Sequence, residues 1–431
     1  MGATKTKPAR DATRPPGGAT AAGSDAGDAT IAGGGTDSRA RLLFARVRRS
    51  PLGVVRGRAK LAAGLAIVAA FYLAAPLADF IAPYDYREQS RAEPHAPPTP
   101  IRFFDREGRF HLRPFIHPRR LVDPMERRYE EDAARAYPLA LLPRGRPYKL
   151  LGLFTTDRHL FGVSDANQQD PRKAPDAPTS RTPDAPASRS VPSSSGRTAA
   201  PRVYLLGTDD FGRDRFSRLL AAARFSLAVG PLGTLLAGLL GVLVGCVSGY
   251  AGRLIDAVLM RAADAMMALP ALVLILAARA ALPLDLPPLR AGAFIVVIFV
   301  AVGWAEMARL TRGLVLELRS REFVTAAVAL GMTEARVLFR HVLPNAARPI
   351  LVQASLMLPA FLLAETALSY LGVGVQEPEA SWGNMLAEAG NLSHLREQPL
   401  VILAPAFAIF LFVLGVRLVG DGLRRDDTGG F

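Results

Sequence analysis

Apolar positions in this chain fall in long uninterrupted blocks separated by polar stretches that are rich in arginine and proline. The first block covers residues 61–83, and five more follow after residue 225. A helix needs about 20 apolar residues to cross a bilayer. The pattern therefore predicts an all-α polytopic membrane protein with six transmembrane helices, at about 59–83, 226–250, 262–282, 290–309, 350–372 and 400–420.

The polar stretches predict three further regions. Residues 1–58, rich in glycine, alanine and then arginine, are typical of a disordered basic tail, and residues 165–203 of a disordered linker rich in proline, serine and arginine. Between them, residues 84–164 predict a small β-rich insert. Its first element is a hairpin at 101–112 with a turn near Gly108, and residues 148–154 and 159–163 add strands.

The distribution of charge predicts how the spans are oriented in the membrane. Basic residues crowd the segment before the first span, which places the N-terminus in the cytoplasm. Six spans return the C-terminus to the same side and place the insert outside. The loop at 312–348 is then cytoplasmic and carries many arginines, whereas the loop before the last span is acidic, as this orientation requires.

Composition excludes several classes of function. The net charge of +14 would indicate nucleic acid in a soluble protein, but these basic residues lie beside apolar blocks, so no nucleic-acid partner is expected. A single cysteine, Cys246, excludes a disulfide framework or a cysteine metal site within the chain. The six histidines lack paired-ligand spacing, so neither a metal site nor a catalytic residue is predicted.

The loop at 312–348 holds the most informative pattern. Residues 320–330 predict a short helix that stops at Gly331, and a second helix starts near Thr333 and ends before Pro344. The small side chains of Ala326 and Ala327 would let another surface approach closely. The loop is therefore interpreted as a helix pair that docks into a groove on a partner.

This loop resembles the EAA loop of bacterial ABC importer permeases, whose pattern is Glu-Ala-Ala, three residues, Gly, nine residues and Ile-x-Leu-Pro. Thr325 stands in place of the glutamate and His341 in place of the isoleucine, and Glu322 offers a charge one turn earlier. The resemblance implies contact with an ATPase through eight residues: Glu322, Thr325, Ala326, Ala327, Gly331, Glu334, Leu343 and Pro344.

Further motifs narrow the resemblance to the dipeptide/oligopeptide (DppC/OppC-type) permeases. They lie at 207–219, 223–227, 340–345, 364–372, 381–385 and 420–424. They imply a type I ABC importer core over residues 226–425, preceded by an amphipathic segment at 204–225. The motif assigned to the outer face consists of Gly207, Thr208, Asp209, Gly212, Arg213, Asp214, Ser217, Arg218, Trp382, Gly383 and Asn384.

The resemblance also implies the partners. They are a second, different permease subunit, two cytoplasmic ATPase subunits that hold ATP-Mg, an extracytoplasmic binding protein that delivers peptides, and the lipid of a bacterial inner membrane. The chain has no phosphate loop of its own, since none of its five lysines follows a glycine. It is therefore expected to be a transport subunit that binds no cofactor and is not an enzyme.

Several alternatives stay open on the residues alone. Intramembrane charge is costly, so Glu365 and Asp264 are candidates for the pathway, with Met266 and Met267 beside them, although packing roles compete. The amphipathic segment at 207–219 is either a gate or docking element at the outer surface or an interfacial helix that only positions the second span. An ion-coupled secondary transporter and a membrane-anchored extracytoplasmic binding or scaffold protein are the rival functions.

Overall fold

The computed structural model of the protein describes residues 51–163 and 201–425, except 106, 124–126, 151, 251, 282, 284, 285, 391–394 and 397. The predicted linker at 165–203 lies outside the described residues apart from its last three positions. The predicted tail at 1–58 lies outside them up to residue 50, and its last eight residues already belong to a helix.

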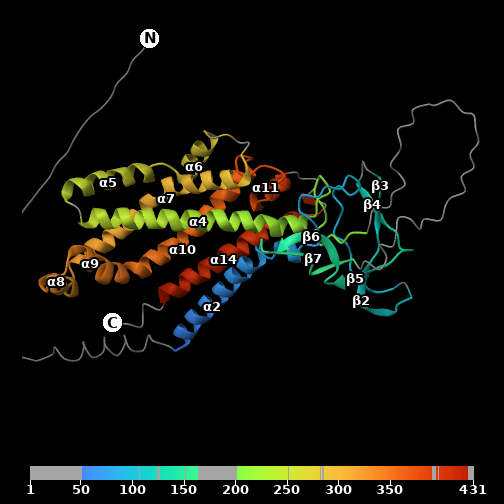
Figure 1. Ribbon diagram of the computed structural model, residues 1–431, viewed down its shortest axis with the longest axis horizontal. Coiled ribbons are helices and arrows are strands. Elements are labelled where there is room, and N and C mark those ends of the chain that lie inside the picture. The colour runs from blue at the N-terminus through green and yellow to red at the C-terminus, as the bar shows by residue number, and fades with distance from the viewer. Residues whose placement is uncertain are drawn as a thin grey trace, which may run out of the picture. The chain divides into compact units, whose positions relative to one another are not determined.

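The described residues contain five helices that are long and apolar enough to cross a membrane (Figure 1). They are α2 (Pro51–Ala74), α4 (Arg215–Tyr250), α7 (Pro288–Arg319), α10 (Leu343–Tyr370) and α14 (Ala404–Arg425). The mostly helical, membrane-spanning fold expected from the sequence is thus confirmed.

The span predicted at 262–282 is not one straight helix. It corresponds to two helices, α5 (Arg253–Met267) and α6 (Ala271–Ala280), which meet at an angle of 84°. Pro270 lies at the break. A continuing helix would need a backbone N–H that proline lacks, and the proline ring would clash with the carbonyl group of the preceding turn. The count of spans is therefore five, or six if this bent pair is one of them.

Short helices connect the long ones. They are α3 (Ala78–Ile81), α8 (Glu322–Ala329), α9 (Glu334–Val337), the π-helical turn η2 (Leu338–Val342), α11 (Trp382–Ala387), the 3-10 turn η3 (Glu388–Gly390) and α13 (Pro399–Ile402). The prediction that the second loop helix ends before Pro344 is wrong, because helix continues from Glu334 to Tyr370. The wide turn η2 precedes Pro344, where a regular α-helix would lose a bond to the proline ring.

The insert is rich in strands, as predicted. Strands β1 (Arg102–Phe104), β2 (Phe110–Ile116), β5 (Tyr137–Leu141) and β8 (Phe161–Val163) form an antiparallel sheet in that order. Strand β3 (Arg119–Asp123) pairs with β4 (Arg128–Glu131), and β6 (Arg144–Leu150) with β7 (Phe154–Arg158). The predicted hairpin is the β1–β2 pair, in which Phe104 faces Phe110.

Small residues on α4 allow α7 to pack closely against it. A Cβ atom added to Gly241 would lie 2.6 Å from the Cβ atom of Met307, and one added to Gly245 would lie 2.6 Å from the carbonyl oxygen of Ala308. Close backbone approach of this kind is the usual way in which membrane helices associate. Gly241 and Gly245 therefore pack α4 against α7 within the chain itself.

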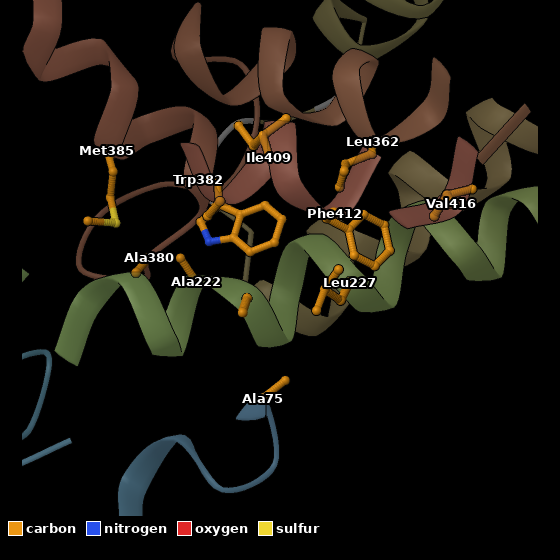
Figure 2. Packing of buried hydrophobic residues seen from close by; sticks show 12 residues of the cluster. Ala75, Ala222, Leu227, Leu362, Ala380, Trp382, Met385, Ile409, Phe412 and Val416 are labelled. Atoms are coloured by element: carbon orange, nitrogen blue, oxygen red, sulfur yellow. The ribbon is translucent and has the colours of Figure 1, made fainter. Parts of the chain in front are cut away.

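A second packing centre joins α2, α4, α10, α11 and α14 (Figure 2). Trp382 and Phe412 are buried there, and the ring of Phe71 makes edge contacts with both at centroid distances of 5.8 and 5.6 Å. Figure 2 shows the Trp382 indole between Ile409 and the α4 residue Ala222. This cluster holds the short helix α11, and with it the 381–385 motif, against the first, second and last long helices.

Candidate functional site

One side of the loop that resembles the EAA motif packs against the ends of α4 and α7. Val324 and Ala327, three residues apart on α8, are buried in an apolar cluster with Cys246 of α4, Val315 of α7 and Val337. Gly331 has a φ of 79° and follows the last residues of α8, as expected for a helix that ends in the left-handed conformation. The loop is therefore a fixed projection from the ends of α4 and α7.

The other side of the loop is open. Five of the predicted contact residues are exposed: Glu322, Thr325, Ala326, Gly331 and Glu334. Where the loop joins α10, Leu343 is half-buried and Pro344 is exposed. Large apolar side chains are exposed among them, namely Phe323, Val328, Leu330 and Phe339.

The prediction that both small residues face a partner is wrong for Ala327, which is only 5% exposed. Its methyl group packs inward, because it lies on the same helix face as Val324. Of these two alanines, Ala326 presents its small side chain to the outside.

The first part of the outer-face motif is a tight turn that precedes α4. Gly207 and Gly212 have φ values of 68° and 72°, and a bridge joins Thr208 to Asp214. The Asp209 carboxylate accepts hydrogen bonds from the backbone N–H groups of Phe211 and Arg213, both at 2.9 Å. The turn is buried against the segment that follows the first span, since Thr208 N donates to the carbonyl oxygen of Ala96 at 2.9 Å.

The arginines of this motif are buried rather than directed at lipid headgroups. The side chains of Arg213, Arg215 and Arg218 are 3%, 5% and 1% exposed. The interpretation of 207–219 as an interfacial amphipathic helix is therefore wrong. A buried arginine requires an acidic partner. Asp209 of the same motif pairs with Arg213 at 2.6 Å and lies 3.5 Å from Arg218, and the other partners come from elsewhere in the chain.

Two acidic residues between α10 and α14 supply that charge. Arg218 Nη2 donates to Glu377 Oε1 at 2.9 Å, Arg213 also bonds to Glu377, and Arg215 Nη2 lies 2.7 Å from Glu388 Oε2. Glu377 and Glu388 are not among the site residues predicted from the sequence. The acidic character of their loop is the sequence signal that points to them.

Burial shifts the pKa of two carboxyl groups in this region. It raises the pKa of Glu388 to about 7, although the positive charge of Arg215 acts in the opposite direction. Burial also raises the pKa of Asp214 to about 6, against hydrogen bonds from the Ser217 side chain and backbone. Both carboxyl groups therefore hold a proton at a higher pH than an exposed carboxyl group does.

Glu365 is completely buried on α10 and belongs to the same region. Ser226 Oγ of α4 donates to its Oε2 atom and Ser369 Oγ to its Oε1 atom, both at 2.9 Å. The backbone N–H of Trp382 donates to Ser226 Oγ at 3.5 Å, and the indole Nε1–H donates to the Leu219 carbonyl at 3.2 Å.

The remaining residues of the 381–385 motif fix α11 against α10. A Cβ atom on Gly383 would lie 2.3 Å from the Thr366 carbonyl oxygen, so only glycine fits there. Asn384 and Ser381 form a reciprocal capping box. The two parts of the outer-face motif and Glu365 thus form one continuous contact region.

The other pathway candidates lie on α5. Asp264 pairs with Arg309 of α7, and both side chains are about half exposed, at 50% and 53%. Met267 is exposed and Met266 half-buried. Within the described ranges, no group of three His, Cys, Asp or Glu side chains is placed to hold a metal ion.

The long apolar helices, the bent pair and the projecting loop define a multi-pass membrane protein of the permease class. Residues 241–425 match the family described as binding-protein-dependent transport system inner membrane component, and residues 58–98 match the N-terminal TM domain of oligopeptide transport permease C. The chain belongs to this family of ABC importer permeases, in its dipeptide/oligopeptide branch.

Curated relatives place it in that branch. The dipeptide transport system permease protein DppC of Alkalihalophilus pseudofirmus is 40% identical over 231 residues, which are 53% of this chain and 73% of the relative. The oligopeptide transport system permease protein OppC of Bacillus subtilis is 40% identical over 219 residues, or 51% and 69%. A crystal structure of an amino acid ABC transporter with histidines aligns at a TM-score of 0.37 and 18% identity, over 48% of this chain and 94% of that one.

Proposed function

We propose that this chain forms one half of the translocation pathway of an ATP-driven importer for peptides. The observation that carries the proposal is the projecting loop, which is fixed to α4 and α7 by Val324 and Ala327 and leaves Ala326 exposed. A rigid projection with a small residue at its outer side suits a groove on an ATPase subunit. The names of the relatives support peptides as the substrate class.

The remaining parts of the assembly follow from this role. A second, different permease subunit completes the pathway, two cytoplasmic ATPase subunits bind ATP-Mg, and an extracytoplasmic binding protein delivers the peptide. Both termini then lie in the cytoplasm of a bacterial inner-membrane protein, with the insert outside, in agreement with the distribution of arginine. The chain itself contributes no ATP site and no bound cofactor.

The proposed mechanism depends on the unbroken helix between the loop and Glu365. ATP binding closes the ATPase subunits and moves the loop, and the helix from Glu334 to Tyr370 carries that movement to Glu365. There the Ser226–Glu365–Ser369 bonds and the contacts of Trp382 link α10 to α4 and α11. A shift of α10 therefore changes the packing at the far end of the pathway.

The test is ATP-dependent peptide uptake by the complex purified from its native membrane and reconstituted in liposomes. Ala326→Arg places a long charged side chain on the open face of α8, and we expect it to lower uptake and coupled ATP hydrolysis at least about tenfold. Ala134→Arg introduces the same side chain at an exposed alanine of the insert and serves as the matched control.

Three results would contradict the proposal. One is equal uptake by the Ala326→Arg and Ala134→Arg variants when both insert normally. The second is uptake that follows an ion gradient without ATP. The third is ATP-dependent uptake that no di- or oligopeptide supports, which would remove the substrate class but keep the importer.

A further inference from the structure

We propose that the β6–β7 hairpin is an interfacial anchor that inserts its apolar tip into the membrane surface and binds anionic lipid headgroups with its basic strands. This surface lies outside the regions matched by the family, which cover residues 58–98 and 241–425. The inference goes beyond the proposed transport function and does not depend on it, because it requires only that the first long helix spans the membrane.

The base of the hairpin is attached where the first span ends. Helix α3 follows α2 after three residues. The backbone N–H of Leu160 donates to the Phe80 carbonyl at 2.7 Å, and His159 Nδ1 lies 2.8 Å from the Ala82 carbonyl oxygen. Among the strands that Figure 1 labels, β6 and β7 lie nearest the helices, with β2 to β5 farther away. The hairpin is therefore held at the level of the membrane surface.

The tip of the hairpin is apolar and exposed. Leu150 faces Phe154 in the last pair of the ladder, and Leu153 lies in the turn between them. Leu153 is 76% exposed and Phe154 is 69% exposed. Transfer of these large apolar side chains from water into the membrane surface is favourable, because it removes apolar surface from water. Leucine and phenylalanine are typical of segments that enter the headgroup–acyl boundary.

The strands behind the tip are basic. Residues 144–158 contain Arg144, Arg146, Lys149 and Arg158 against a single acidic residue, Asp157. Arg144 and Arg146 are 71% and 66% exposed, and their acidic neighbours leave most of each guanidinium open to other contacts. Basic side chains are attracted to the surface of a bilayer that contains anionic lipids. An apolar tip with basic strands is the pattern of a membrane-surface element.

Lipid is the occupant that the position favours. The hairpin begins and ends beside α3, so the nearest surface that it meets is the bilayer around the first span. The β1–β2 hairpin also has exposed aromatic residues, Phe104 and Phe110, but it lies farther from the helices in Figure 1. That hairpin provides an internal comparison of similar size and hydrophobicity.

The test is a fluorescent label at the tip in lipid nanodiscs. Leu153→Cys and Phe154→Cys are each made with Cys246→Ala and labelled with an NBD group, and Phe104→Cys is the matched control. In nanodiscs that contain phosphatidylglycerol, doxyl lipids labelled near the headgroup are expected to quench positions 153 and 154 at least about twofold more than position 104. Replacing phosphatidylglycerol by phosphatidylcholine is expected to reduce this quenching.

The remaining outcomes overturn the proposal. Quenching of positions 153 and 154 by aqueous iodide, with no response to doxyl lipid, means that the tip lies in water. Protection from both quenchers means that another protein covers the tip. Equal lipid quenching in both lipid mixtures removes the anionic-headgroup part. The readout needs no transport, so it is separate from any failure of the proposed function.

Discussion

The hydroxyl of Ser226 lies 2.9 Å from a carboxylate oxygen of Glu365, and this bond joins residues 139 positions apart. A carboxyl group buried within a membrane span is costly unless its oxygens are satisfied. Here each oxygen accepts one serine hydroxyl, and the same Ser226 accepts the N–H of Trp382. The resemblance placed Glu365 in a motif, and the structure shows that its immediate contacts join three helices.

Removal of the Glu365 carboxylate should destabilise the chain. Glu365→Ala leaves two buried hydroxyls without their acceptor, at a cost of about 1–3 kcal/mol each. Glu365→Gln keeps an acceptor oxygen and should lose less. Thermal unfolding in nanodiscs would measure the difference, and equal unfolding midpoints for the two variants would show that the hydrogen bonds contribute nothing.

The stability of the protein should fall as pH rises toward neutrality. Glu388 retains a proton up to about pH 7 in the folded chain, whereas its ordinary pKa is 4.5. The folded state therefore binds more protons between these values, so the stabilisation is complete below pH 4.5 and is lost as pH rises through 7. Asp214, with a pKa raised to about 6, acts in the same direction.

Glu388→Gln should flatten this dependence, as seen in unfolding midpoints measured from pH 4.5 to 8. Glu107→Gln alters an exposed carboxyl group in the insert and should leave the curve unchanged. A steeper curve in Glu388→Gln than in the parent protein would reverse the sign and reject the explanation.

Substitutions at Gly212 and Gly108 should distinguish the effect of a steric clash from the effect of backbone strain. Gly212 and Gly108 have nearly equal φ values of 72° and 74°. A Cβ atom at Gly212 would lie 2.0 Å from the Ser90 carbonyl oxygen, whereas one at Gly108 meets nothing within 4 Å. Gly108→Ala should cost only about 1–2 kcal/mol from the left-handed backbone, and Gly212→Ala should cost clearly more. Similar losses, measured by thermal unfolding, would mean that the turn moves freely away from Ser90.

The two adjacent alanines of the projecting loop should respond differently to the same enlargement. Ala327→Leu overfills the cluster around Val324 and Val315, at a cost of about 1–3 kcal/mol. Ala326→Leu adds a side chain on the open face and should leave stability unchanged. Limited proteolysis of the loop in membranes gives the comparison, and equal cleavage rates would show that α8 is not seated as described.

The parts of the fold that depend on local pattern were predictable. The long apolar blocks, the strand-rich insert and the stop at Gly331 each follow from a few neighbouring residues. The broken span was missed because an apolar run reads alike whether Pro270 bends it or not. The burial of Arg213 and Arg218 could not be predicted, because one of their acidic partners, Glu377, lies more than 150 positions later. Ala327 was misassigned because the face that packs inward is set by α4 and α7.

The π-helical turn before Pro344 has a mechanical consequence. Because it keeps the chain helical from Glu334 to Tyr370, no loop separates α9, the second helix of the projecting loop, from the level of Glu365. At 1.5 Å per residue, 37 helical residues reach across about 55 Å, which exceeds the thickness of the hydrocarbon layer. A displacement at one end is therefore passed along a continuous helix, and the wide turn and the two prolines inside α10, Pro349 and Pro359, are the places where this helix can bend or change its twist.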